Sequence, residues 1–173
     1  PKESMQMLKK MYKDHDSLIG KYGPYDAFSL EYNWLTPRYL AIDQGPIPVM
    51  IENYRSGMLW DLFMKNTDFS CGGDDGPGYQ EPYMPGSDDD PVVIVPLSDE
   101  EMMDLTQKET FKYFWDFANT ASGAAKERYH PNETTLNQNV VTSGGTGFGL
   151  MSIIVAIERG FITRAEGVSR LNK

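Results

Sequence analysis

Asp43 and Gln44 are the residues whose types and spacing most readily suggest chemistry. They stand directly before a Gly-Pro step, in the string AIDQGPIPVM that begins at Ala41. The residues after this step are largely apolar, so the start of the helix they predict should lie inside the structure, where polar side chains need partners or a ligand. The simpler interpretation is that Asp43 caps this helix and that Gln44 is a surface amide. Both interpretations stay open from the sequence alone.

Aromatic residues are concentrated just before this step, in the string YGPYDAFSLEYNWLTPRY at residues 22–39. If Asp43 and Gln44 face a ligand, then Tyr25, Trp34 and Tyr39 are placed to stack on the faces of sugar rings, because an aromatic ring offers apolar area with a polar edge. The alternative is that these three side chains are ordinary aromatic core.

A glycine-rich string, TSGGTGFG at residues 142–149, precedes a strongly apolar run. Helix N-termini bind anions, but this string lacks the Lys-Ser/Thr ending of a phosphate loop, and no β-branched strand comes before it. We therefore exclude phosphate binding. The glycines instead allow a loop to pass close to neighbouring helices or a ligand, which makes Ser143 and Gly144 candidate substrate-binding residues.

The remaining polar candidates are Glu127 and Arg128, which either form a simple ion pair or line a cleft. His15 and His130 have no further ligand at metal-binding spacing, so no metal and no cofactor are expected. No Ser-His or Cys-His arrangement supports nucleophilic hydrolysis.

Charge and composition limit the classes of partner. The chain has 173 residues, a net charge of −9 and 40% apolar residues, which fits an ordinary folded domain. Nucleic acid and anionic membrane surfaces are excluded because they would be repelled. Neutral ligands such as sugars remain open. The longest apolar run, Leu150 to Ile157, is far shorter than a bilayer span, so no transmembrane helix is expected.

Helical periodicity predicts an all-α fold. Helices are expected at residues 1–13, from Pro46 to about Leu62, and at residues 98–119, where Ser98 and Glu101 form a capping box. Apolar residues all round the run from 150 to 157 predict an inner helix. Gly160 should end that helix, and a second capping box at residues 163–166 should begin the last one.

Residues 67–97 read as a flexible linker, because they are rich in Gly, Pro and Asp. They lack the ligand spacing of a calcium-binding EF-hand loop. A short edge strand is expected at Val92 to Val95. Cys71 is the single cysteine, and the string FSCGGDD around it resembles the start of a mature bacterial lipoprotein, which makes Cys71 a lipidation candidate. An ordinary free thiol is the alternative.

The strings DQGP, IENYR, FWDFA, GGTGFG and IERGFI, taken together, closely resemble the bacterial glucoamylase-like domain family. This family includes glycoside hydrolases that act on β-1,2-glucans, and the resemblance implies an α/α-barrel of six helical hairpins. It implies a glucan or oligosaccharide substrate, contacted by Asp43 and Gln44. In the family, however, FWDFA and IERGFI stand near the beginning and DQGP near the end, so the order here is reversed.

The reversed order suggests three parts: residues 1–66 as the C-terminal part of such a barrel, 67–97 as a linker or lipoprotein-like segment, and 98–173 as the N-terminal part. Twelve helices of about 12 residues with loops of about 5 need on the order of 200 residues, so this chain cannot close the ring alone. The resemblance places the catalytic carboxylates in a DLVE-like string that is absent here.

The preferred hypothesis is therefore that this chain is part of a glycoside hydrolase in bacterial carbohydrate metabolism. It is expected in the periplasm or at the cell surface, with a lipid anchor if Cys71 is acylated. The catalytic acid and base are not assigned to any residue. The alternative hypothesis is a non-catalytic helical module that binds carbohydrate or another protein.

Overall fold

The structure is a computed structural model that describes residues 2–65, 97–133 and 136–173. The described part is mostly helical. Its α-helices are α1 (Lys2–Asp14), α2 (Ala41–Gln44), α3 (Pro46–Ser56), α4 (Met58–Met64), α5 (Asp99–Asp116), α6 (Ser143–Glu158) and α7 (Arg164–Leu171). Two 3-10 turns accompany them, η1 (Asp16–Leu18) and η3 (Leu136–Asn139).

Short strands form three antiparallel pairs. These are β1 (Ile19–Gly20) with β2 (Gly23–Pro24), β3 (Ala27–Ser29) with β4 (Trp34–Thr36), and β5 (Tyr39–Leu40) with β6 (Arg128–Tyr129). The first two pairs are local hairpins. The third joins distant parts of the chain, with Tyr39 opposite Tyr129 and Leu40 opposite Arg128.

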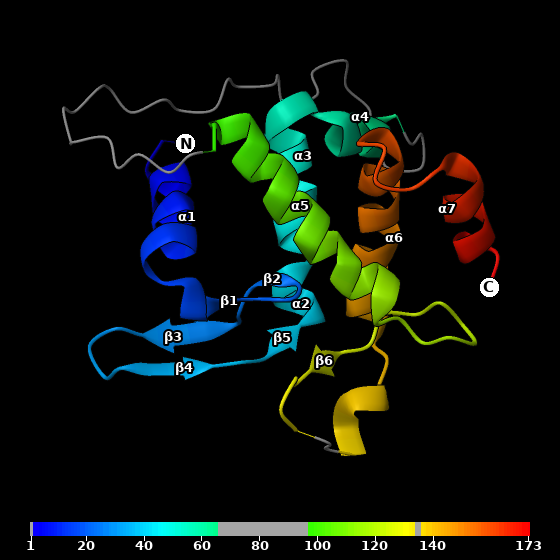
Figure 1. Cartoon of the computed structure of the whole chain (residues 1–173). Coiled ribbons are helices and arrows are strands. Elements are labelled where there is room, and N and C mark those ends of the chain that lie inside the picture. The colour runs from blue at the N-terminus through cyan, green and yellow to red at the C-terminus, as the bar shows by residue number, and fades with distance from the viewer. Residues whose placement is uncertain (1, 66–96, 134–135) are drawn as a thin grey trace.

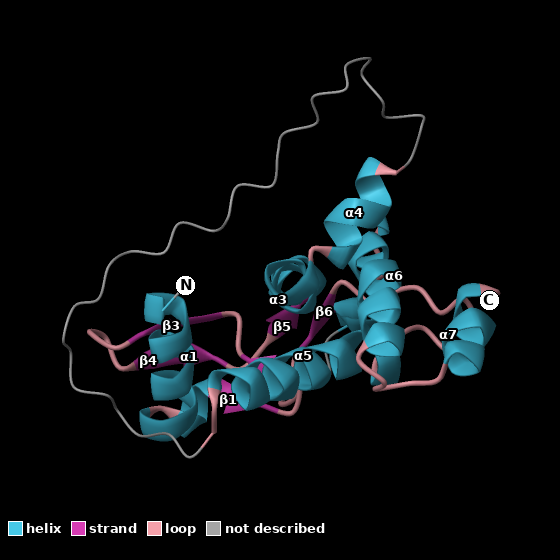
Figure 2. Ribbon diagram, turned by 90° about the horizontal axis from the view of Figure 1, so that it is seen from above, coloured by secondary structure: helices cyan, strands magenta, loops and turns pink. Residues whose placement is uncertain are grey.

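Helices α3, α5 and α6 form the centre of the molecule, and α3 packs against both of the others. Figure 1 shows α5 crossing α3 at an angle, with α6 alongside. Seen from above, α1 and α7 lie at opposite ends (Figure 2). The short α2 lies between the strand pairs and the start of α6, and this position makes it important for the site.

The predicted helix ends are largely confirmed. Ser98 and Glu101 form a full capping box at α5, and Thr163 and Glu166 form another at α7. Gly160 follows α6 with φ +69°, a left-handed conformation that favours glycine. The long helix expected from Pro46 is interrupted, because Gly57 has φ +71° and separates α3 from α4.

Helix α6 corrects two expectations. It begins at Ser143, with the Thr142 side chain accepting a hydrogen bond from Gly145 N, so the glycine-rich string is the first turns of the helix and not a loop before it. The predicted inner helix also has a solvent-facing side, since Leu150 is 46% exposed and Ile154 is 36% exposed. Apolar residues all round a helix do not by themselves show that every face is covered.

The apolar core consists of clusters shared between distant segments. One contains the buried residues Tyr22, Tyr39, Ala41, Tyr113, Phe114 and Ala125. A second joins Val49 of α3 and Leu59 of α4 to Val155 of α6. A third lies between α5 and α6, around Phe111, Ile153 and Ala156. The first two clusters hold residues 2–65 against the rest of the described chain.

The described part is compatible with the predicted all-α class, while a closed six-hairpin barrel stays a prediction. Most of the predicted linker at 67–97, including Cys71 and the strand at Val92 to Val95, lies outside the described residues. None of the helices within the described ranges is long and apolar enough to cross a membrane.

Candidate functional site

Helix α2 and the first turn of α6 are in direct contact, and two glycines allow it. A Cβ atom added at Gly145 would lie 2.7 Å from Ala41 Cβ. One added at Gly45 would lie 2.2 Å from Phe148 Cγ. Both distances are too short for real side chains, so only glycine fits at these positions. The Asp43-Gln44 pair and the glycine-rich helix start therefore belong to one local structure.

Asp43 does not act as a helix cap. Gly45, which precedes α3, is itself helical with φ −61° and ψ −47°, and no side chain caps α3. The Gly45 N–H donates to Ala41 O at 3.0 Å, so the hydrogen bonding of α2 continues to the start of α3. Because α2 runs directly into α3, there is no separate helix N-terminus for Asp43 to cap. The capping interpretation is wrong, and Asp43 is an exposed residue within α2.

Asp26 lies beside Asp43, close enough for its side chain to act on the Asp43 carboxyl group. Partial burial, followed by the hydrogen bonding and the negative charge of Asp26, raises the pKa of Asp43 above its ordinary value. Asp26 is held in place through its backbone, since its N–H donates to Arg38 O at 3.1 Å.

Gln44 is not a surface amide, since only 2% of it is exposed. Its Nε2 donates to Pro24 O at 2.9 Å, which ties α2 to β2. Its Oε1 is buried and accepts no hydrogen bond from the described residues. A buried oxygen without a donor costs about 1–3 kcal/mol of stability.

The three predicted stacking residues occupy different environments. Tyr39 is fully buried in the aromatic cluster, which confirms the core interpretation for this residue. Tyr25 is half-buried, with its ring centroid 5.1 Å from that of Tyr39. Trp34 is 52% exposed on β4 and is the member of the three that is open to solvent.

Glu127 and Arg128 form an ion pair, as one interpretation predicted. Arg128 Nη2 lies 2.9 Å from Glu127 Oε1, and a second contact joins Arg128 Nε to the same carboxylate. The pair lies next to α2, because Glu127 O accepts a hydrogen bond from Ala41 N at 2.8 Å. Both side chains are partly exposed. Whether they also contact a ligand stays a prediction.

Ser143 and Gly144 lie at the exposed start of α6. A Cβ atom added at Gly144 would meet nothing within 4 Å, and the same is true of Gly147. One side of this glycine-rich turn therefore packs on α2 through Gly145, while another side is open. Among the described residues, no group of three or more His, Cys, Asp or Glu could hold a metal ion.

Asp26 was missed by the sequence reasoning. It lies 17 positions before Asp43 and carries no motif of its own. The β3–β4 hairpin returns the chain and brings the residues that flank it together, as the bond from Asp26 N to Arg38 O shows. No local motif in the sequence marked this contact.

Comparisons with known proteins support a glucoamylase-like glycoside hydrolase family. Residues 1–67 match the family model described as putative glucoamylase. The chain is also 45% identical over 73 residues to an exo β-1,2-glucooligosaccharide sophorohydrolase (non-reducing end) from Parabacteroides distasonis. That alignment covers 42% of this chain but only 10% of the relative, so the chain spans about a tenth of it. No solved structure matches.

Proposed function

We propose that this chain is part of a glycoside hydrolase that acts on β-1,2-linked glucooligosaccharides. The observation that carries the proposal is the 45% identity, over 73 residues, to the protein named as an exo β-1,2-glucooligosaccharide sophorohydrolase. The family-model match at residues 1–67 adds support and includes Asp43 and Gln44. The net charge of −9 is consistent with a neutral substrate.

The catalytic carboxylates are proposed to lie outside this chain. Glycoside hydrolases generally use two carboxyl groups about 5–9.5 Å apart, one on each side of the scissile bond. Asp26 and Asp43 lie side by side, close enough for Asp26 to raise the pKa of Asp43, and neither is assigned as the acid or the base. Their proposed role is to bind substrate hydroxyl groups, with Trp34 stacking on a ring face.

The proposed contact surface consists of α2, β6 and the open side of the first turn of α6. Asp43 supplies a carboxyl group, Arg128 a cation and Gly144 an exposed backbone. The packing of Ala41 against Gly145 supports this arrangement, because it brings the two segments that the resemblance emphasises to one place.

Calorimetric titration of the 173-residue chain with β-1,2-glucooligosaccharides and with maltooligosaccharides tests the proposal. We expect measurable binding of the β-1,2-linked series and at least about tenfold weaker binding of the maltooligosaccharides. Asp43→Asn should weaken the β-1,2 interaction, whereas Asp61→Asn on α4 is the matched control and should not. Equal binding of both series, or binding that Asp43→Asn leaves unchanged, would contradict the proposal.

The second candidate is a non-catalytic helical module that binds carbohydrate or a protein. Large exposed apolar side chains on α4 and α6, such as Trp60 and Leu150, favour a surface that another polypeptide covers. The intact mass of the native protein separates the two candidates. A mass far above 19.6 kDa supports a larger enzyme. A monomer of 19.6 kDa that unfolds cooperatively supports the module.

Acylation of Cys71, with a periplasmic or cell-surface location, is part of the same proposal. It makes a simple prediction, because an acyl chain adds a defined mass to the peptide that contains Cys71. Mass spectrometry of the protein purified from membranes should find that mass, and a free thiol there would contradict acylation.

A further inference from the structure

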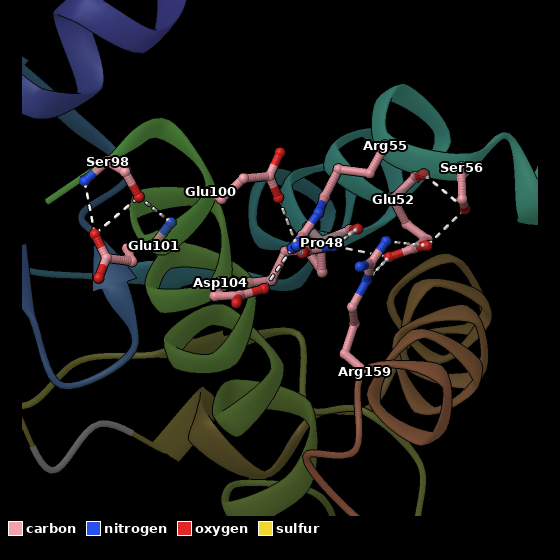
Figure 3. A network of polar contacts seen from close by, with 10 residues as sticks. Pro48, Glu52, Arg55, Ser56, Ser98, Glu100, Glu101, Asp104 and Arg159 are labelled. Carbon is pink, nitrogen blue, oxygen red and sulfur yellow. Dashed lines mark hydrogen bonds and ion pairs between the residues drawn. The ribbon is translucent and has the colours of Figure 1, made fainter.

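A buried ion pair joins the two described segments of the chain at the centre of the molecule. Glu52 on α3 is fully buried, with 0% of its surface exposed. Arg159, just after α6, donates to it from Nε at 2.6 Å and from Nη2 at 2.7 Å. Figure 3 shows Arg159 reaching Glu52 from the end of α6, with Ser56 on the other side of the carboxylate. A bidentate pair of this kind specifies both position and orientation.

A second group of contacts joins α3 to α5. Arg55 donates to Asp104 Oδ1 at 2.5 Å and to Glu100 Oε2 at 2.9 Å. It also donates to Gln107 Oε1 at 2.7 Å. The Gln107 Nε2 in turn donates to Pro48 O at 3.1 Å and to Glu52 Oε2 at 3.3 Å. Gln107 thus links the Arg55 contacts to the buried ion pair.

The contacts of Arg159, Arg55 and Gln107 connect residues 2–65, here called the first segment, to the described residues of 97–173, the second segment. The charges are complementary, since Arg55 meets two acids and Glu52 meets Arg159. Strand pairing of β5 with β6 and the close packing of Gly45 on Phe148 connect the same two segments. The contact surface therefore combines close packing with paired charges.

The two segments differ in whether their buried apolar clusters are made within the segment or shared with the other one. The cluster of Phe111, Ile153 and Ala156 lies entirely within the second segment. The buried clusters that contain first-segment residues, around Tyr39 and Val49, are completed by second-segment residues such as Tyr113 and Val155. An apolar cluster made of its own residues is thus shown for the second segment, whereas the buried clusters of the first segment are shared.

We propose that the second segment is a binding surface for the first segment, and that the two remain associated as separate polypeptides. The partner that this surface fits is a helix with the α3 pattern, carrying an inward glutamate and an arginine three residues later. Covalent connection through residues 66–96 then sets the local concentration of the segments and does not hold the interface together. This inference is independent of carbohydrate binding.

The test uses the intact chain, folded first and divided afterwards. A protease recognition sequence is inserted between residues 80 and 81, the purified protein is cleaved to completion, and the product is examined by native mass spectrometry and near-ultraviolet circular dichroism. We expect a one-to-one complex with an unchanged spectrum at micromolar concentration. Separation into free fragments, or loss of the near-ultraviolet signal on cleavage, would overturn the proposal.

Two matched substitutions show whether the buried pair specifies this association. In the cleaved protein, Arg159→Gln should raise the dissociation constant by about a hundredfold or more, because it leaves the Glu52 carboxylate buried without its cation. Arg170→Gln removes a contact to Trp115 O that lies within the second segment, and it should change the dissociation constant by less than about threefold.

If the Arg159→Gln chain does not fold, the Arg55→Gln variant tests the proposal in its place. Arg55 contacts two exposed acids and Gln107, so its replacement should weaken the association by about tenfold. A complex that neither Arg159→Gln nor Arg55→Gln weakens would contradict the proposed basis of recognition.

Discussion

At the scale of single residues, the protein holds carboxyl groups in two different surroundings. Partial burial, followed by the hydrogen bonding and charge of Asp26, raises the pKa of Asp43. Burial alone would raise the pKa of Glu52, but hydrogen bonds from Arg159, Ser56 and Gln107 outweigh it, so the pKa is lowered. The lowered pKa keeps Glu52 ionised, which suits a structural ion pair.

The Asp26→Asn substitution should lower the pKa of Asp43. The amide of the new side chain donates to the Asp43 carboxylate without adding a negative charge, so the ionised form is favoured. Carbon-13 NMR of the aspartate carboxyl groups as a function of pH measures this. Asp26→Ala is the companion variant. Asp43 stays partly buried in it and gains no new donor, so the pKa of Asp43 should fall less than in Asp26→Asn. An unchanged Asp43 titration in both variants would show that Asp26 does not contact it.

The Glu52→Gln substitution should reduce the free energy of unfolding by about 2–3 kcal/mol at neutral pH. Loss of one partner of a buried pair typically costs about 3–5 kcal/mol, and Arg159 is partly exposed, so we expect a value below that range. Glu127→Gln is the control and should cost less than about 1 kcal/mol, because that pair is partly solvated. Denaturant unfolding followed by circular dichroism measures both.

The same residue should contribute to acid unfolding. The folded-state pKa of Glu52 is below its unfolded value, so its stabilising contribution is complete above the unfolded value and is lost as the pH falls through the folded one. The native protein should therefore lose stability on acidification more steeply than Glu52→Gln. If the free energy of unfolding fell with pH at the same slope in both proteins, this assignment would be contradicted.

At the scale of elements, glycines decide where helices can meet and where they stop. Gly45 and Gly145 allow α2 to contact α6, and Gly57 ends α3. Capping boxes and the stop at Gly160 were predictable from the sequence because they depend on a few neighbouring residues. The split of the long helix was missed, although the left-handed glycine at Gly57 is a local stop signal. A close approach of the glycine-rich string to a neighbouring element was expected, but not that α2 would be the partner, since α2 lies far away along the chain.

Substitution of two glycines in α6 should have opposite effects on stability. Gly145→Ala places a methyl group 2.7 Å from Ala41 Cβ and should destabilise the protein by about 1–3 kcal/mol. Gly147→Ala meets nothing within 4 Å and should stabilise it by up to about 1 kcal/mol, since alanine favours the helix. Thermal unfolding compares the two variants, and equal effects would show that α2 does not pack closely here.

At the scale of the whole molecule, residues 2–65 and 97–173 should unfold together. Their apolar clusters are shared, with Tyr39 packed on Tyr113 and Val49 on Val155. We expect the amide protons of α3 and α6 to exchange with the same opening free energy. Hydrogen exchange measured by NMR tests this, and markedly faster exchange throughout α3 would indicate that the first segment opens separately.

The sequence predicted the helical class, because periodicity carries that information. A local motif also made Asp43 and Gln44 candidate site residues. The sequence left the burial of Gln44 open between two interpretations, and it did not predict the contact between Asp26 and Asp43. These arise from a hairpin and from packing against β2, which no local pattern specifies. The closed barrel that the resemblance implies stays a prediction, since the chain covers about a tenth of its curated relative.

Amide chemical-shift mapping of the labelled chain with a β-1,2-linked glucooligosaccharide tests the central claim most directly. The account predicts that the shifts concentrate at residues 41–45, 127–128 and 143–147, where α2, β6 and the start of α6 meet. Perturbations confined to α4, α7 or the outer face of α1, with these three stretches unchanged, would contradict it.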